Sequence, residues 1–393
     1  MTDIAAHSEA DVVEAVRAAR EWKSPLNIVG ARTKRAFGRA VAGWGTVLDL
    51  SGLSGVVAYE PEELILTVRP GTKVAEIETL LAAKNQRLGF DPADWGPLFG
   101  ASAGAGTIGG AIAADVAGSG AVRHGRVRDH LLGFHAVNGL GEAYKAGGRV
   151  VKNVTGFDLP KLMCGSFGTL GPLTEVTLRI FPKPPLSATL AVRDIVAQEG
   201  LALLRRVWSS PLDATGLAYI PASVAFAGLE SGAALIRLDG AREPLREKVA
   251  ALRALLCASD MREIEEGDAL FRKLGDGAPF FGNAFDVWRV AVPPASTAGC
   301  AAEIASPFWY ADWAGGMLWV GSDPQDAEAP AKLRAIAMRA GGHATLMRAS
   351  EDSRAQIPIF QPEPPERAAL TRAVKAAFDP LGLFNPGRMF EGV

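Results

Sequence analysis

The stretch between residues 150 and 178 constrains the fold of this chain more than any other. Its sequence, VVKNVTGFDLPKLMCGSFGTLGPLTEVTL, predicts a polar turn, a short helix, a glycine-rich loop and a strand in close succession. Because glycine has no Cβ, main-chain amides in such a loop can approach a bound group closely. We therefore expect a fold that combines helices and strands, with this loop able to lie close to a neighbouring group.

Length and charge narrow the classes of protein to which the chain can belong. A chain of 393 residues can bury a large core and is expected to form two domains, or three. The net charge of −2 shows no basic excess of the kind that binds nucleic acid. The first residues contain neither a basic region nor an apolar segment, so we expect no signal peptide.

A membrane span and a metal centre are also disfavoured by the sequence. Residues 101–122 contain a single charge, Asp115, but they are rich in glycine and contain no leucine or phenylalanine, so a spanning helix is not expected. Cys164, Cys257 and Cys300 are far apart and form no C-x-x-C motif, so no disulfide, zinc site or iron–sulfur cluster is expected. Reduced thiols favour a cytoplasmic protein.

The hydrophobic pattern changes at the proline-rich sequence of residues 182–185. Before it, short strands alternate with helices, including one that Ser8 would cap and one that Thr72 would cap. After it, a roughly repeated order of strands and helices predicts an antiparallel sheet covered by helices. A second proline-rich joint follows at residues 361–365, so we expect domain boundaries at these two places.

Two glycine-containing segments are candidates for binding a nucleotide. Residues 30–35, GARTKR, follow a predicted strand and combine a tight turn with positive charge, which suits a pyrophosphate but also an ordinary solvated loop. Residues 104–109, GAGTIG, match the G-x-G-x-x-G pattern, with Asp129 about twenty residues further on. A Rossmann unit requires a buried apolar strand just before the glycines, and residues 94–103 do not predict one.

Taken together and in order, these segments resemble the flavin-contacting motifs of the FAD-linked oxidases of the vanillyl-alcohol-oxidase type, also called the p-cresol methylhydroxylase (PCMH) type. The similarity to their pyrophosphate loop, their later flavin segments and their closing motif makes a Rossmann unit unnecessary. The motifs are VGARTK (29–34), TIGGAIAADVAG (107–118), RHGRVRD (123–129), VKNVTGFDL (151–159), GSFGTLG (165–171) and DPLGLFNPGR (379–388).

The resemblance implies an α+β protein with the two-domain FAD-binding fold of the vanillyl-alcohol-oxidase (PCMH) type. The FAD-binding domain would comprise residues 1–183 together with a returning C-terminal segment, residues 366–393. An antiparallel-sheet cap, or substrate domain, would comprise residues 186–360. The residues implied to bind FAD are Gly30, Ala31, Arg32, Thr33, Lys34, Thr107, Ile108, Gly109, Gly110, Ala113, Asp115 and Leu173.

The chain departs from the family pattern at several positions. Phe167 replaces an acidic residue and Pro172 removes a main-chain donor, so one contact to the nucleotide is expected to be missing or moved to Leu173. Thr33 and Lys34 stand where members with covalent flavin carry histidine, so we expect non-covalent FAD. The H-x-H and G-D-G-N-x-H metal motifs of the catalytic 2-hydroxyacid dehydrogenases in this group do not occur, so no metal site is expected.

Within this group the chain looks like the FAD-binding subunits of glycolate oxidase, on the basis of its compact length, LFNPGR at residues 383–388 and GGHATLMR at residues 341–348. This resemblance implies an oxidoreductase acting on the CH–OH group of 2-hydroxy acids, in a complex with a homologous FAD subunit and an iron–sulfur subunit. The complex would be cytoplasmic, or attached at the inner membrane through those partners. Two alternatives stay open: an electron-relay or structural flavin subunit, and a stand-alone FAD-dependent oxidase of another substrate.

A flavin dehydrogenase of 2-hydroxy acids needs a cation to hold the carboxylate and a base to accept the hydroxyl proton. Arg289, His343 and Arg348, in the predicted cap, have the chemistry for these catalytic roles. Alternatively, Arg289 is an exposed strand residue and His343 only completes a loop. The tryptophans of the same region form either its core or an interface with a partner.

Overall fold

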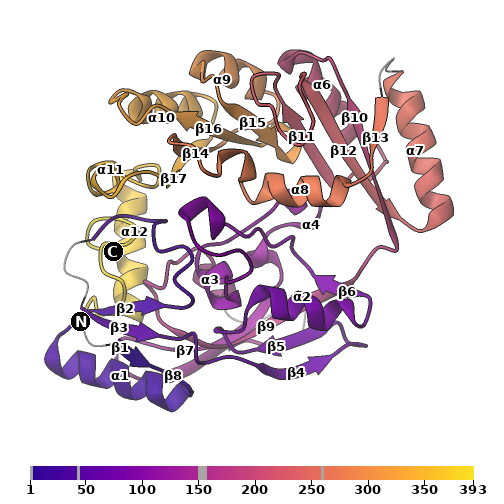
Figure 1. Cartoon of the computed structure of the whole chain (residues 1–393). Coiled ribbons are helices and arrows are strands. Elements are labelled where there is room, and N and C mark those ends of the chain that lie inside the picture. The colour runs from indigo at the N-terminus through magenta and orange to yellow at the C-terminus, as the bar shows by residue number, and fades with distance from the viewer. Residues whose placement is uncertain (1–2, 42–44, 149–156, 258–260) are drawn as a thin grey trace. The chain divides into compact units, whose positions relative to one another are not determined.

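The computed structural model describes residues 3–41, 45–148, 157–257 and 261–393 (Figure 1). The polar turn expected at residues 150–156 lies outside the described residues. The chain divides into two compact units. Unit 1 comprises Met1–Val116, Arg126–Lys183 and Glu351–Val393, and unit 2 comprises Ala117–Gly125 and Pro184–Ser350.

Unit 1 contains two sheets (Figure 1). The smaller sheet is parallel, in the order β1–β3–β2, and consists of β1 (Asp3–Ala5), β2 (Leu26–Val29) and β3 (Thr46–Asp49). The larger sheet is antiparallel, in the order β4–β5–β9–β7–β8, and β6 pairs with β9. Its strands are β4 (Val56–Glu60), β5 (Ile65–Val68), β6 (Gln86–Leu88), β7 (Leu131–Val137), β8 (Ala143–Gly147) and β9 (Leu173–Pro182).

The first helix, α1 (Glu9–Trp22), forms as its sequence predicts. Ser8 and Asp11 make a capping box, an arrangement whose N-cap residue typically contributes about 1 kcal/mol. The apolar stripe that includes Val12 and Val16 packs in one core with the strands of the small sheet. The other helices of unit 1 are α2 (Val74–Ala82), α3 (Ile108–Ala113), α5 (Leu159–Met163), α11 (Glu351–Gln356) and α12 (Pro365–Phe378), with short 3₁₀ turns at Pro97–Phe99 and Val127–Asp129.

Thr72 does not cap α2, which corrects the expectation from the sequence. The N-cap residue is Lys73, and no side chain bonds to the start of that helix. The Thr72 hydroxyl instead donates to the carbonyl of Arg69 at 2.7 Å and accepts from the N–H of Gly55 at 2.9 Å. A threonine hydroxyl can form hydrogen bonds within a turn as readily as at the start of a helix. Here the hydroxyl of Thr72 bonds within the turn that precedes α2.

Unit 2 is built on an eight-stranded sheet in the order β13–β10–β12–β11–β15–β16–β14–β17 (Figure 1). Every pair in it is antiparallel, as the sequence predicted for the second domain. The strands are β10 (Leu186–Val192), β11 (Gly216–Ile220), β12 (Ala233–Gly240), β13 (Met261–Ile264), β14 (Asp286–Ala291), β15 (Trp309–Asp312), β16 (Met317–Ser322) and β17 (His343–Arg348). The helices are α4 (Ala121–His124), α6 (Ala197–Trp208), α7 (Arg242–Leu256), α8 (Gly267–Gly275), α9 (Thr297–Ile304) and α10 (Ala329–Arg339), with 3₁₀ turns at Ala278–Phe280 and Trp313–Gly315.

Aromatic side chains fill both faces of this sheet. On one face of the sheet, Trp288 of β14 is fully buried, and the guanidinium of Arg334 from α10 lies over its ring. On the opposite face, the rings of Tyr310 and Trp319 stack with their centroids 5.9 Å apart, and the Tyr310 hydroxyl donates to a carbonyl of α8. These large rings are core residues of unit 2, as one of the two readings of the sequence expected.

The compact units differ from the expected domain boundaries at two places. Residues 117–125 belong to unit 2, where the Ser119 hydroxyl donates to the Asp312 carboxylate at 2.6 Å and the Trp313 indole donates to the Gly118 carbonyl at 3.0 Å. Residues 351–360 belong to unit 1, where Arg354 donates to the Gly38 carbonyl at 3.1 Å. In both cases the reassigned residues make long-range polar contacts within their unit, which local sequence patterns do not report.

Candidate functional site

Two adjoining cavities of unit 1 lie among the residues singled out by the sequence. One encloses about 650 Å³ of space and the other about 540 Å³, part of it open to solvent. Their common walls come from β2 and the loop after it, from α3 and its cap, and from the loop before β9. The residues that line both cavities are Ile28, Val29, Gly30, Thr107, Gly110, Ala113 and Phe167, and we call the joint space the cleft.

The loop after β2, residues 30–35, lines the cleft, and most of its main-chain N–H groups are unbonded among the described residues. Within the described part of the chain, the N–H groups of residues 30–34 donate no main-chain hydrogen bond, and the turn closes at Arg35, whose N–H donates to the Arg32 carbonyl. A Cβ on Gly30 would lie 2.7 Å from the Thr107 hydroxyl, so only glycine allows this approach to the α3 segment. Amides arranged in this way suit an anionic ligand such as a pyrophosphate.

The start of α3 forms the facing wall. Its N-cap Thr107 accepts a hydrogen bond from the Gly110 N–H at 3.2 Å, and the Gly109 N–H donates to the Pro70 carbonyl at 2.8 Å. A Cβ on Gly109 would lie 2.9 Å from that same carbonyl oxygen. The protein therefore fixes the first turn of α3 itself, and the glycines keep it close to its neighbours.

Lys34 brings a positive charge into the cleft. Its ammonium donates to the Thr33 hydroxyl at 3.4 Å and lies 3.7 Å from the place that a Cβ on Gly110 would occupy. Removal from water lowers the pKa of Lys34 to about 8, against the opposing attraction of Asp94. A desolvated ammonium is stabilised by an anion, so this residue fits a phosphate-containing cofactor.

Arg32 shapes the loop through its backbone conformation, and its charge is already paired with two carboxylates. Its guanidinium donates to the carboxylates of Asp3 at 2.9 Å and Asp49 at 3.0 Å, and these bonds raise its pKa. Its φ of 59° lies in the left-handed region, which shapes the turn of the loop. The positive charge expected from this position is therefore already balanced within the protein.

The loop before β9 closes the cleft with Phe167 in the place of the family's acidic residue. Phe167 has a φ of 53°, and its ring packs edge-on against Phe37 and Phe360, with centroids 4.9 Å and 5.2 Å away. The next residue, Gly168, has a φ of 72°, and a Cβ there would lie 2.7 Å from the Asn385 amide nitrogen. An aromatic cluster thus replaces the polar interaction that an acid would make.

The structure brings most of the predicted FAD-binding residues to the cleft, although two lie elsewhere. Ile108 is fully buried in the core, and the carboxylate of Asp115 pairs with Arg126. Helical spacing explains the first case, because positions 107, 110 and 113 share the face toward the cleft and position 108 points away. The predicted residues that line it are Gly30, Ala31, Arg32, Thr33, Lys34, Thr107, Gly109, Gly110, Ala113 and Leu173.

Several wall residues are absent from that prediction. Asn385 and Arg388 come from the C-terminal segment, whose motif DPLGLFNPGR was the available signal for them. The guanidinium of Arg388 donates to the carbonyls of Arg35 at 2.7 Å, Lys34 at 3.3 Å and Phe37. Burial and the neighbouring arginines lower the pKa of Arg388 to about 10. The other wall residues outside the prediction are Asn27, Ile28, Val29, Arg35, Leu50, Pro70, Ala114, Met163, Ser166, Phe167, Gly168, Gly171 and Pro172.

The three catalytic candidates of unit 2 do not form one cluster. Arg289 in β14 and His343 in β17 lie on one face of neighbouring strands, since Ala291 pairs with His343. The Arg289 guanidinium lies 5.1 Å from the Trp313 ring and 5.2 Å from the Trp319 ring.

Arg348 has a different environment from the other two candidates. It donates to the carbonyls of Phe280, Asn283 and Phe285 and to the Asn283 side chain, at 2.8 to 2.9 Å. Burial lowers its pKa, against the opposing attraction of Asp286. Arg348 therefore holds the loop before β14, and a structural role accounts for its chemistry.

The described residues contain no group of histidine, cysteine and acidic side chains that could hold a metal ion. In the same residues, no helix is long and apolar enough to cross a membrane.

Similarity to known proteins identifies the family of this chain. A model of the FAD binding domain matches residues 3–147. Glycolate oxidase subunit GlcE of Escherichia coli (strain K12) is 33% identical over 382 residues, which cover 96% of each chain. D-lactate dehydrogenase of Anaerostipes hadrus is 31% identical over 48% of this chain and 38% of its own length.

Solved structures agree with the fold. p-Cresol methylhydroxylase with substrate bound superposes with a TM-score of 0.70 over 99% of this chain and 88% of its own, at 16% identity. 4-Ethylphenol oxidase from Gulosibacter chungangensis gives a TM-score of 0.69 over 99% and 89% of the two chains, at 15% identity. The predicted fold class is therefore confirmed. The chain binds FAD and belongs to the glycolate oxidase subunit GlcE family, within the PCMH-type FAD-linked oxidases.

Proposed function

We propose that this protein is the FAD-binding subunit of a complex that oxidises glycolate or a related 2-hydroxy acid and delivers the electrons to an iron–sulfur partner subunit. The observation that carries the proposal is the cleft, in which the pyrophosphate loop, α3 and the loop before β9 meet. The similarity to a glycolate oxidase subunit over nearly the whole chain supports the substrate class. A glycolate oxidase subunit GlcD is among the relatives, which supports a homologous flavin partner.

The residues of the cleft have distinct parts in this proposal. The amides of residues 30–34 and the ammonium of Lys34 hold the pyrophosphate, and the glycines of α3 allow the dinucleotide to lie close to the main chain. Bound FAD supplies hydride acceptance, chemistry that no side chain of the protein provides. Attachment of the FAD is proposed to be non-covalent, because Thr33 and Lys34 stand where a covalently attached flavin would need a histidine.

In unit 2, Arg289 is proposed to hold the substrate carboxylate, and His343 to accept the hydroxyl proton. Two indole rings confine the Arg289 guanidinium and fix its orientation, which favours recognition of a planar carboxylate. His343 lies exposed at the start of β17, on the same face of the sheet.

A second candidate function is favoured by one specific observation. Arg348, the third proposed catalytic residue, uses its guanidinium on carbonyls of its own unit. This leaves fewer groups for binding substrate and favours a flavin subunit that relays electrons or supports the complex while a homologous partner performs the oxidation.

Anaerobic addition of glycolate or D-lactate to the isolated, FAD-loaded chain distinguishes these two candidate functions. Bleaching of the flavin supports catalysis by this chain, and an unchanged spectrum supports the relay.

Acid precipitation tests the mode of attachment. Non-covalent FAD is expected to remain in the supernatant, and yellow colour in the pellet would contradict this part of the proposal.

Gentle purification from native extract is expected to recover an iron–sulfur protein with this chain. Recovery of the chain by itself would count against the proposed complex.

A further inference from the structure

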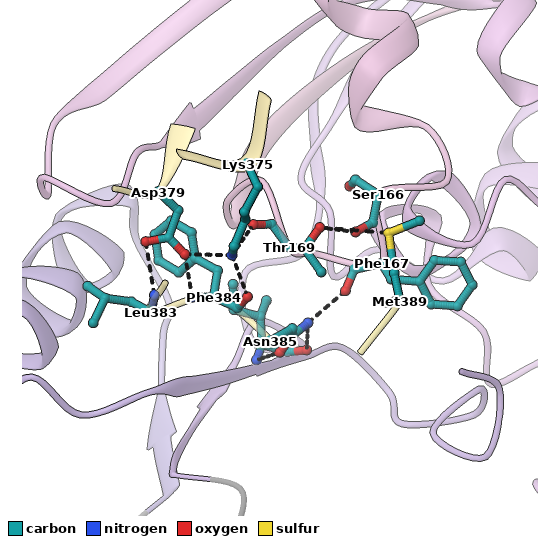
Figure 2. Close-up of polar contacts among 10 residues, drawn as sticks. Ser166, Phe167, Thr169, Lys375, Asp379, Leu383, Phe384, Asn385 and Met389 are labelled. Atoms are coloured by element: carbon teal, nitrogen blue, oxygen red, sulfur yellow. Dashed lines mark hydrogen bonds and ion pairs between the residues drawn. The ribbon is translucent and has the colours of Figure 1, made fainter. Parts of the chain in front are cut away.

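Asn385, in the segment that follows α12, connects two walls of the cleft (Figure 2). Its Oδ1 accepts a hydrogen bond from the Ile28 N–H at 2.7 Å, and its Nδ2 donates to the Phe167 carbonyl at 2.7 Å. Ile28 belongs to β2, which leads into the loop of residues 30–35, and Phe167 belongs to the loop before β9. One buried amide therefore links segments that lie 357 and 218 positions away from it in the sequence.

The residue type at this position is strongly constrained. Asn385 has a φ of 42°, in the left-handed region where asparagine is favoured over most residues. Its N–H also donates to the Leu26 carbonyl at 3.0 Å, so the main chain is held against β2. Only a short side chain with both a donor and an acceptor can make the two amide bonds from this backbone.

A buried ion pair holds Asn385 in place (Figure 2). The ammonium of Lys375 donates to Asp379 at 2.7 Å, to the Thr169 carbonyl at 2.7 Å and to the Phe384 carbonyl at 2.8 Å. The side chains of Lys375 and Asp379 are 6% and 0% exposed. The network therefore fixes both the residue before Asn385 and the loop that Asn385 contacts.

We propose that Asn385, supported by the Lys375–Asp379 pair, is a positioning residue that sets the separation between the pyrophosphate loop and the loop before β9. It acts through Ile28 and Phe167. Without the amide, the part-buried N–H of Ile28 and the part-buried carbonyl of Phe167 both lose this partner, and the two walls are no longer tied to each other. This inference rests on the binding of FAD in the cleft.

Two substitutions test the role of the side chain. Asn385→Gly retains the left-handed backbone and removes both amide bonds, whereas Asn385→Asp retains the acceptor for Ile28 and places a carboxylate oxygen against the Phe167 carbonyl. The apoproteins are titrated with FAD well below their unfolding midpoints, and Kd is taken from the quenching of flavin fluorescence. We expect Kd to rise about tenfold or more in both variants. If the glycine variant does not fold, the milder aspartate variant decides.

Thr297→Val, in unit 2, is the matched control for general destabilisation. It removes the buried hydrogen bond from the Thr297 hydroxyl to the Gly315 carbonyl, 2.6 Å long, without touching the cleft. We expect it to lower the unfolding midpoint while its Kd stays that of the wild type. Wild-type Kd values in the Asn385 variants, or an equal rise in Thr297→Val, would overturn the inference. Failure of the wild type to bind FAD would instead refute the site itself.

Discussion

Replacing Lys34 by methionine is expected to stabilise the apoprotein while weakening its binding of FAD. The pKa of Lys34 falls from 10.5 to about 8 because the ammonium is removed from water. At neutral pH, keeping the ammonium charged in the folded state lowers the free energy of unfolding by at most about 3 kcal/mol. The actual cost is smaller, because the Lys34 side chain is only half-buried and solvent screens its charge. Methionine is similar in shape and carries no charge, so it recovers part of this energy.

The lowered pKa also sets the direction of the pH dependence. Between about pH 8 and 10.5 the unfolded chain retains the Lys34 proton that the folded apoprotein has released. The free energy of unfolding attributable to Lys34 therefore rises with pH in this window. Binding of the pyrophosphate requires the charged form, so the wild-type affinity for FAD is expected to fall as the pH rises above about 8.

Urea unfolding of the apoproteins and FAD titration, each at neutral pH and at about pH 9.5, test both effects. Lys84→Met, at an exposed position after α2, is the control and is expected to change neither quantity appreciably. An Lys34→Met variant that binds FAD as tightly as the wild type would refute the reasoning. So would an apoprotein that is less stable than the wild type at neutral pH.

Three further substitutions have expected outcomes. Gly30→Ala places a Cβ 2.7 Å from the Thr107 hydroxyl, so we expect weaker FAD binding by titration and a loss of about 1–3 kcal/mol in urea unfolding. Arg348→Lys loses the planar fork that serves the loop before β14, so the thermal midpoint should fall while the Kd for FAD does not change. Lys375→Met leaves the Asp379 carboxylate buried without its cation and is expected to cost about 3–5 kcal/mol. Adding Asp379→Leu removes the unpaired charge but is expected to recover only part of this loss, because the N–H groups of Leu383 and Phe384 then lose their acceptor. Equal stability of the single and the double variant would count against this explanation.

Local sequence patterns and family motifs predicted those features that depend mainly on residues within one segment. The capping box of α1 forms as expected, because its geometry depends on neighbours in the sequence. The loop at residues 30–35 and the glycine-rich segment around Thr107 both line the cleft. The failures have physical causes of two kinds. Thr72 serves the turn before α2 instead of the helix, and Ile108 faces the core although its neighbour Thr107 faces the cleft.

Long-range pairing accounts for what the sequence could not predict. The balance of the Arg32 charge by Asp3 and Asp49 depends on the order of strands in the small sheet. The capture of Arg348 by carbonyls and the link made by Asn385 both join residues that are distant in the sequence. No periodicity marks such partners, so side chains that look available for a ligand can already be engaged.

Amide hydrogen exchange of the apoprotein, measured with and without FAD, shows whether the cofactor binds in the cleft. The account predicts new protection in three separated stretches: the loop at residues 30–35, the segment at residues 107–114 and the loop at residues 165–173. Protection confined to other parts of the chain, or an exchange pattern that FAD does not change, would contradict it.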